Sequence, residues 1–104
     1  MIVEQRTYTL HPGKAAEWIE VYQQRGYEMQ VRCLGRMVGY FTSELGVLNQ
    51  VVHLWAYEDL EDRRRRREVL AAKPEWQALL KKLLPLVREM ESKILIPAPF
   101  SPVR

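Results

Sequence analysis

The part of this chain that most constrains its fold is the stretch of residues 49–57, which reads NQVVHLWAY. It is rich in β-branched and aromatic residues that alternate with a two-residue period, so it predicts a central β-strand. One face of this strand would present Val52, Leu54 and Ala56, which we expect to pack against helices. The opposite face carries larger and more polar groups, at Val51, His53, Trp55 and Tyr57. That face needs cover, and its polar tips favour a lined cavity or a partner surface.

Apolar periodicity predicts the elements on either side of this strand. Three more strands are predicted, over residues 2–10, 35–43 and 90–96. Helices are predicted over residues 14–31, 60–72 and 74–85. Gly26 is expected to bend or end the first helix, Asp59 to cap the second, and Pro85 to end or kink the third. Gly39 indicates a bulge in its strand or a close approach by another backbone, and residues 97–104 are expected to form an extended, proline-rich C-terminal tail.

The order of these elements, β-α-β-β-α-β, predicts a single α+β domain over residues 1–104 with a ferredoxin-like antiparallel sheet of four strands. The first and third strands of such a sheet are central neighbours. We therefore expect two sets of residues to share the sheet face away from the helices: Glu4, Arg6 and Tyr8 with His53, Trp55 and Tyr57. A monomer would expose Trp55 and Tyr57 there, so we expect a homodimer that pairs through this face and forms an α-β barrel. Assembly beyond a dimer, and docking of the tail on a neighbouring subunit, are both compatible with the sequence.

The composition restricts cofactors and partners. Cys33 is the only cysteine, which excludes an intramolecular disulfide and a multi-cysteine metal site, and we predict neither a metal nor a cofactor. No apolar run approaches the ~20 residues of a membrane span, and the first residues lack the pattern of a targeting segment, so a cytoplasmic location is expected.

The net charge of +3 comes largely from five consecutive arginines at residues 63–67. Because no aromatic residues interleave with this run, nucleic-acid binding is not expected.

The five arginines must differ in their surroundings, because five successive residues cover the full circumference of a helix. With Leu60 and Leu70 as the apolar stripe, Arg63 and Arg67 are placed near the core. Their stems should lie on apolar surface while their guanidinium groups bind a carboxylate or backbone carbonyls. The other three are placed at the border of the stripe or in solvent: Arg64, Arg65 and Arg66.

One group of residues carries side chains suited to acid-base chemistry, to binding an anion and to lining a cavity: Glu4, Arg6, Tyr8, His53, Trp55 and Tyr57. His53 is a candidate catalytic acid or base, Arg6 a candidate partner for an anionic ligand, and the aromatic rings are candidate walls of a cavity. A dimer interface would also use such residues, in ion pairs and hydrogen bonds that satisfy buried polar atoms. The residues are therefore compatible with either a site or a structural interface.

Several segments of the chain resemble the NIPSNAP family. They are residues 4–13 (EQRTYTLHPG), 38–41 (VGYF), 48–57 (LNQVVHLWAY) and 74–76 (PEW), together with Arg63. They span nearly the whole chain, and residues 48–57 are the most specific part. The resemblance implies a ferredoxin-like protomer of the dimeric α-β barrel group, whose sheet pairs with that of a second copy around a cavity.

The resemblance implies no established reaction. Members in animals are linked to mitochondria, vesicle traffic and the removal of damaged mitochondria, and related barrels include cofactor-free monooxygenases and isomerases. We interpret the chain as a homodimeric barrel that binds a small molecule or a partner protein. The alternative is a cofactor-independent enzyme, monooxygenase-like or isomerase-like, that uses the cavity between the two sheets. In that enzyme His53 would be the acid-base group and Arg6 would hold an anionic substrate.

Overall fold

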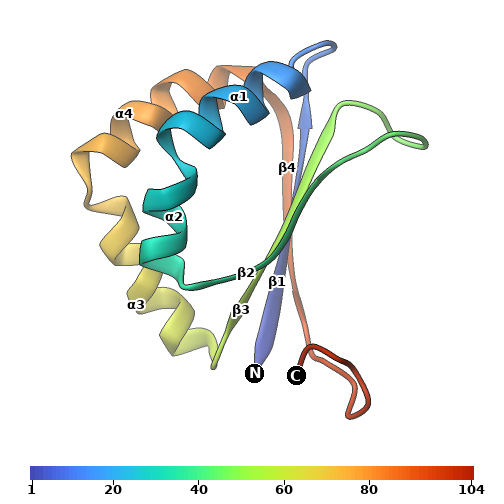
Figure 1. Cartoon of the computed structure of the whole chain (residues 1–104), viewed down its shortest axis with the longest axis vertical. Coiled ribbons are helices and arrows are strands. Elements are labelled where there is room, and N and C mark those ends of the chain that lie inside the picture. Colours follow the sequence, from blue (N-terminus) through green and yellow to red (C-terminus); the bar gives the residue numbers. More distant parts are fainter.

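The computed structural model describes all 104 residues and shows a sheet that carries its helices on one face only (Figure 1). The elements in chain order are β1 (Ile2–Leu10), α1 (Ala15–Arg25), α2 (Tyr27–Leu34), β2 (Arg36–Thr42), β3 (Gln50–Tyr57), α3 (Leu60–Ala71), α4 (Pro74–Leu83) and β4 (Val87–Leu95). This order confirms the predicted ferredoxin-like α+β fold. None of the helices combines the length and the apolar character that crossing a membrane requires.

The four strands form one antiparallel sheet in the order β2-β3-β1-β4, so β1 and β3 are central neighbours, as predicted. Their register places Glu4 opposite Trp55 and Arg6 opposite His53. Residues that are opposite each other in a ladder project from the same face of the sheet. Glu4, Arg6 and Tyr8 therefore share a face with His53 and Trp55.

The predicted glycine break in the first helix is confirmed. α1 ends at Arg25 and α2 begins at Tyr27, with Gly26 between them. A Cβ atom on Gly26 would lie 2.7 Å from Cδ2 of Leu79, so a larger residue would push against α4 at this corner. The second helix of the pair continues to Leu34, beyond the predicted end at residue 31.

The predicted cap at Asp59 and the predicted helix end at Pro85 are confirmed as well. Asp59 caps α3, because its Oδ1 accepts a hydrogen bond of 2.7 Å from the backbone N–H of Asp62. A new helix, α4, starts with Pro74 in its first turn. It ends at Leu83, and Pro85 lies in the short 3-10 turn that follows.

The strand boundaries depend on pairing as well as on local sequence. β4 begins at Val87 rather than at residue 90, because its ladder with β1 continues to the pair Leu10 and Val87. In β2 the register with β3 shifts between Met37 and Gly39, which confirms the predicted bulge.

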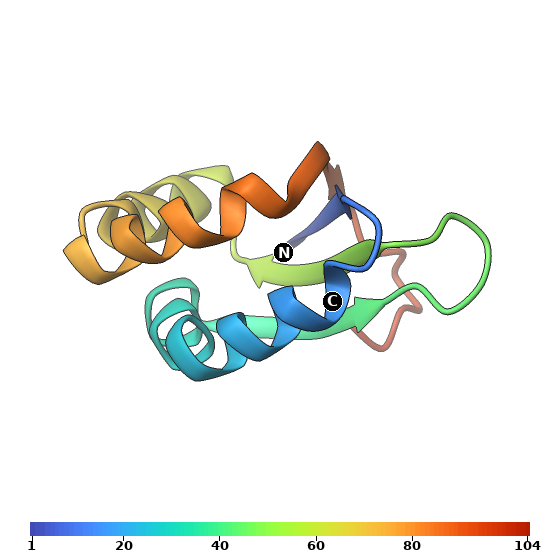
Figure 2. The same cartoon turned by 90° about the horizontal axis from the view of Figure 1, so that it is seen from above.

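The prediction of which face of β3 meets the helices is wrong. The buried set is Val51, His53, Trp55 and Tyr57, each between 0% and 3% exposed. Val52, Leu54 and Ala56 project from the opposite face, where Val52 and Leu54 are half-buried and Ala56 is buried at 6% exposure. Figure 2 shows α1 with α2 and α3 with α4 as two pairs that lie over the same side of the sheet, and α2 packs beside α3. Three of the four buried residues are aromatic and reach from the sheet to the helices, a depth that the smaller set of Val52, Leu54 and Ala56 would leave unfilled.

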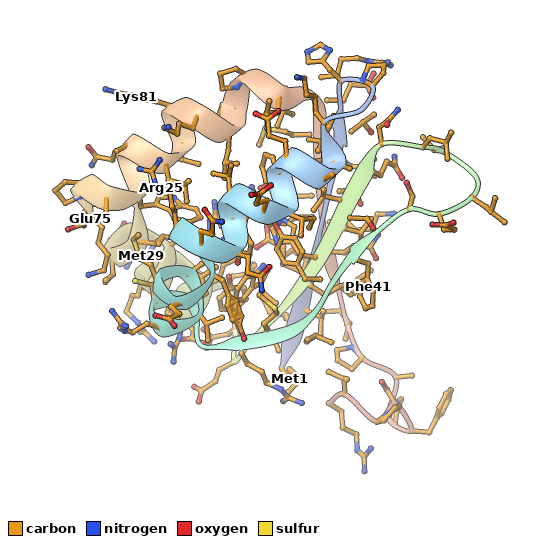
Figure 3. All side chains as sticks on the ribbon, turned by 45° about the horizontal axis from the view of Figure 1, so that its top comes forward. Met1, Arg25, Met29, Phe41, Glu75 and Lys81 are labelled. Atoms are coloured by element: carbon orange, nitrogen blue, oxygen red, sulfur yellow. The ribbon has the colours of Figure 1, made fainter.

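The sheet face away from the helices is only partly covered in the single chain, where Val3 and Ala56 are the buried residues of that face. It carries the half-buried Val52 and Leu54, and Phe41 of β2, which is 56% exposed and lies on this side in Figure 3. Trp55 and Tyr57, on which the expectation of a dimer rested, lie on the other face. A dimer formed through the open face would therefore bury Phe41, Val52 and Leu54 instead.

Candidate functional site

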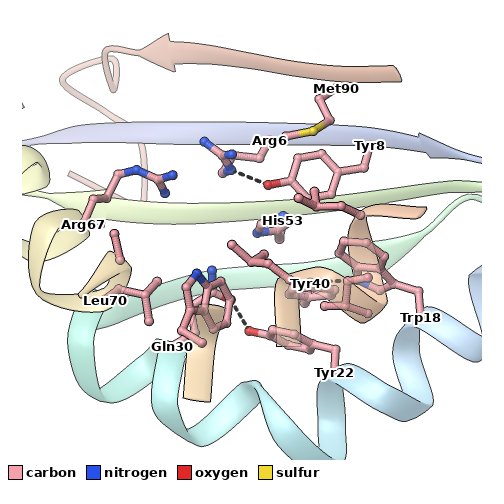
Figure 4. Close-up of a pocket in the computed structure, with 15 residues that line it drawn as sticks. Arg6, Tyr8, Trp18, Tyr22, Gln30, Tyr40, His53, Arg67, Leu70 and Met90 are labelled. Carbon is pink, nitrogen blue, oxygen red and sulfur yellow. Dashed lines mark hydrogen bonds between the residues drawn. The ribbon is translucent and has the colours of Figure 1, made fainter. Parts of the chain in front are cut away.

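A cavity of about 290 Å³ lies between the helices and the sheet (Figure 4). Eleven of its fifteen lining residues are hydrophobic. The aromatic part of the wall comes from two strands and two helices, as Tyr8, Trp18, Tyr22, Tyr40 and Trp76. Ala71, Leu84 and Met90 are lining residues that are exposed, so the cavity opens to solvent on their side. This cavity belongs to the single chain and lies beneath its helices, so it differs from the cavity that the sequence predicts between the sheets of two protomers.

The residues singled out in the sequence divide into those that line the cavity and those that do not. The lining ones are Arg6, Tyr8, His53 and Arg67. Glu4, Trp55 and Arg63 lie outside the lining, and Glu4 and Trp55 hold lining residues through hydrogen bonds. Tyr57 borders a second hollow, next to Arg66, and its buried hydroxyl has no hydrogen-bond partner. The structure thus separates a wall from the residues that support it.

His53 is fixed in the wall by its neighbours. Its Nδ1 atom accepts a hydrogen bond of 2.7 Å from the indole Nε1 of Trp55. The ring of Tyr40 stacks on the imidazole at 4.6 Å between centroids, and the ring of Tyr8 meets it edge-on at 5.1 Å. Because Nδ1 is an acceptor, the neutral imidazole carries its proton on Nε2, which is buried and has no partner within the protein. His53 therefore has an N–H donor that the protein leaves unused, on a side chain that lines the cavity.

The imidazole of His53 stays neutral over the physiological range. Burial lowers its pKa from 6.5 to about 3, and the positive charge of Arg6 acts in the same direction. A neutral histidine with so low a pKa is a poor proton acceptor near neutral pH, because the protonated form is costly. The geometry and the pKa together favour a hydrogen-bond donor over a general base.

The low pKa of His53 makes the protein sensitive to mild acid. Below pH ~6.5 the unfolded chain binds a proton at this histidine while the folded chain does not, so the free energy of unfolding falls as the pH falls toward 3. The contribution of this one group approaches ~1.4 kcal/mol per pH unit. Urea unfolding between pH 6.5 and 4.5 measures it. We expect His53→Gln, whose amide can accept and donate as neutral imidazole does, to flatten the profile in this window.

The only other histidine provides the control for that experiment. His11 is exposed at the turn after β1, so His11→Gln should keep the acid sensitivity of the unmodified protein. An unchanged slope in His53→Gln, or a flat profile in His11→Gln, would contradict the assignment of the effect to His53.

Glu4 anchors the cationic side of the site. Its carboxylate is fully buried and accepts hydrogen bonds from Nε and Nη2 of Arg63 at 3.0 and 2.9 Å, from Nη1 of Arg6 at 2.9 Å and from Oγ of Ser92 at 2.6 Å. Burial raises the pKa of this carboxyl, but the hydrogen bonds from Arg63 and Ser92 and the charge of Arg6 outweigh it and hold the pKa at about 2. Arg6 also donates from Nε to the hydroxyl of Tyr8 at 2.8 Å. Glu4 is thus a charged, saturated structural group that orients Arg6.

The five arginines of α3 have distinct surroundings. Arg63 binds Glu4 in the bidentate manner described above, and Arg64 pairs with Glu61 and Glu68. Asp62 pairs with Arg65 at 3.8 Å and with Arg66 at 2.9 Å. Arg67 forms no ion pair and lines the cavity.

One expectation about the arginine run differs from the structure: Leu60 is 59% exposed, so the apolar stripe of α3 contains Leu70 but not Leu60. Arg66 is exposed, as expected, and it also has two partners: its Nε binds Asp62 and its Nη1 donates to the carbonyl of Cys33 at 3.5 Å. α2 packs beside α3 and supplies this acceptor, which helical periodicity alone does not reveal.

Several lining residues were not identified from the sequence. Tyr40 could have been inferred as a neighbour of His53 from the strand pattern, because β2 pairs with β3 and places Tyr40 opposite His53. Its hydroxyl accepts a hydrogen bond of 2.8 Å from Nε1 of Trp18. Tyr22 and Gln30 are joined by a hydrogen bond from the hydroxyl to the amide oxygen. The latter pair has no signal in the sequence, because it depends on the angle between α1 and α2.

Comparison with known proteins gives one consistent family. The model of the NIPSNAP family matches residues 3–102. The curated protein NipSnap homolog 2 of Mus musculus is 39% identical over 103 residues, which make up 99% of this chain and 36% of the mouse protein. The chain therefore spans about a third of the length of that relative.

Solved structures agree with this. An uncharacterized NIPSNAP-like domain protein from Burkholderia xenovorans is 52% identical with a TM-score of 0.95, over 97% of this chain and 88% of that one. A NIPSNAP family protein with unknown function from Agrobacterium tumefaciens is 43% identical with a TM-score of 0.98, over 100% and 94%. The structure of an antibiotic biosynthesis monooxygenase matches 95% of this chain and 100% of its own at a TM-score of 0.66 and 12% identity, which shows a shared fold alone.

Proposed function

The chain belongs to the NIPSNAP family, and from this premise we propose that it is a homodimeric binding protein that holds a small, largely apolar molecule in the cavity of each protomer. The observation that carries this proposal is an aromatic cavity whose lining includes His53, with its buried and unpartnered Nε2–H, and Arg67, which forms no ion pair. A buried donor without an acceptor costs free energy, so a site that keeps one is suited to a ligand that supplies the acceptor. The volume of about 290 Å³ is close to the lower end of the roughly 300–1,000 Å³ of ligand pockets.

Binding is favoured over acid-base catalysis as the role of this site. The enzymatic alternative, a cofactor-independent monooxygenase or isomerase, would need His53 to exchange protons with a substrate. Its pKa of about 3 and its hydrogen bond from Trp55 oppose that role near neutral pH. The likeness to the antibiotic biosynthesis monooxygenase concerns the fold, which does not carry a reaction with it.

Blocking the mouth of the cavity tests the binding proposal. Ala71 is exposed and lines the cavity, so Ala71→Trp adds a large ring there with little disturbance of the core. We expect this change to weaken the binding of a neutral probe, 2-naphthalenemethanol, by at least about tenfold, or ~1.4 kcal/mol, in isothermal titration calorimetry. Ala78→Trp is the control, because Ala78 is exposed on α4 and does not line the cavity. Equal affinities in the two variants would contradict the proposed site.

We propose that the dimer forms through the open face of the sheet. Apolar groups are exposed there in the single chain, and face-to-face packing of two sheets would bury Phe41, Val52 and Leu54. Leu54→Lys would place a charge in that interface and should convert a dimer into monomers in sedimentation at micromolar concentration. Because the cavity lies within one protomer, the monomeric variant should still bind 2-naphthalenemethanol. Sedimentation of the unmodified protein as a monomer would contradict the dimer.

A further inference from the structure

We propose that the ligand of the cavity is an apolar carboxylate, with its carboxylate group near Arg67, Arg6 and His53 and its body against the aromatic wall. This inference rests on the function proposed above and adds the chemical class of the ligand. It follows from the hydrogen-bonding groups that the protein leaves unused in the wall, and from the balance of charge around them.

Arg67 is the first of these groups. Each of the other four arginines of the run has a carboxylate partner within the protein, from Glu4, Glu61, Asp62 or Glu68. Arg67 has none, although it is half-buried and its side chain lines the cavity. Figure 4 shows it extending from α3 toward Arg6. A guanidinium group in such a place is suited to bind a carboxylate through two parallel hydrogen bonds.

Arg6 and His53 supply further donors. Nε and Nη1 of Arg6 are engaged by Tyr8 and Glu4, so Nη2 is the nitrogen that remains for a ligand. The Nε2–H of His53 is buried and unpartnered, and the residue is only 2% exposed. A carboxylate accepts hydrogen bonds on both oxygens and donates none, which matches a set of donors.

The charge balance around the wall favours a negatively charged ligand, because Arg6, Arg63 and Arg67 lie there with the single carboxylate of Glu4. No carboxylate lines the cavity, whereas two arginines do. Glu4 is the acidic group next to the wall, and it is shared between Arg6 and Arg63. Arg67 thus carries a charge near the cavity without a carboxylate partner. A neutral ligand that displaced water from the cavity would leave this charge desolvated, and a cationic ligand would be repelled.

The remainder of the cavity selects the body of the ligand. Beyond the four polar residues, the lining consists of aromatic rings, leucines, Ala71 and Met90. Such a surface binds hydrocarbon by excluding water, and flat rings can stack on its aromatic residues. An aromatic or branched aliphatic acid satisfies both parts of the cavity.

Three probes that share one hydrocarbon body test the inference: 2-naphthoate, 2-naphthalenemethanol and 2-naphthyl phosphate. Calorimetry at pH 7.5 should show 2-naphthoate binding about tenfold more tightly than the alcohol, in the range expected of a charge-assisted pair. Tighter binding of the phosphate than of the carboxylate would overturn the carboxylate class. Rising salt should weaken the binding of the carboxylate and leave that of the alcohol nearly unchanged.

Variants of the arginine run assign the effect to one residue. Arg67→Gln should reduce the affinity for 2-naphthoate to that for the alcohol, and Arg67→Lys should restore part of the difference. Arg65→Gln is the matched control, because Arg65 lies on the outer side of the same helix with 60% of its side chain exposed. Equal binding of acid and alcohol by the unmodified protein would overturn this inference while the binding function stands. Binding of neither probe would overturn the binding function itself.

Discussion

Replacing Glu4 by alanine is expected to lower the free energy of unfolding by about 3–5 kcal/mol, the cost of removing one partner from a buried ion pair. Glu4 is fully buried and accepts four hydrogen bonds, two of them from Arg63 and one each from Arg6 and Ser92. Without it two guanidinium groups lose their counter-charge at the centre of the sheet. Urea unfolding at pH 7 measures the loss.

Two further variants give this measurement its controls. Ser92→Ala removes one of the four hydrogen bonds to Glu4 and should cost about 1–3 kcal/mol, as for a hydrogen bond to a charged group. Glu17→Ala removes an exposed carboxylate whose nearest cation, on Lys14, is 3.5 Å away, and it should change stability by less than ~0.5 kcal/mol. A loss of under ~1 kcal/mol in Glu4→Ala would show that the buried network contributes little to the fold.

Replacing Trp55 by alanine is the second change with a large expected effect, about 3–5 kcal/mol of unfolding free energy. The side chain is fully buried between the sheet and the helices, in a cluster with Cys33, Leu34, Tyr57 and Leu70. Its removal leaves a cavity that these neighbours can fill only in part. Thermal or urea unfolding of the variant at pH 7 measures the effect.

A smaller change at the same position separates packing from hydrogen bonding. Trp55→Phe keeps much of the bulk but removes the N–H that binds Nδ1 of His53, and it should cost about 1–3 kcal/mol. Trp76→Phe is the comparison, because Trp76 is half-buried in the cavity wall. Equal losses in the two variants would contradict a specific role for the Trp55 hydrogen bond.

The features that the sequence predicts correctly are those with local causes. The break at Gly26, the cap at Asp59 and the helix end before Pro85 each depend on the conformational preferences of one or two residues. The bulge at Gly39 and the order of elements are of the same kind. These features indicate the fold, and the usual topology of the fold makes β1 and β3 neighbours. Arg6 and His53 then share one face of the sheet.

The face of β3 could not be decided in this way. Alternation identifies two sets of side chains, but both sets in residues 49–57 contain apolar groups. Polar tips on His53, Trp55 and Tyr57 favour the outer face, whereas the structure buries these residues and joins the indole N–H of Trp55 to Nδ1 of His53 by a hydrogen bond. The depth between sheet and helices decides the outcome, and it depends on tertiary packing.

The cavity was beyond prediction for the same reason. Its wall combines residues from all four strands and all four helices, among them Gln30 of α2, Arg67 of α3 and Met90 of β4. Helical periodicity could place Arg67 near the core but could not show that a cavity lies there or that its neighbours on α3 would take the available carboxylates. The unused donors therefore become visible only when the contacts of the whole wall are known.

We propose that the ligand site lies within each protomer, beneath the helices and beside His53, and not between the sheets of two protomers. A crystal structure of the protein soaked with 2-naphthoate distinguishes the two locations. We expect density for the acid between His53, Arg67 and the aromatic wall. Density between the open sheet faces, against Val52 and Leu54, with no acid in the cavity, would contradict it.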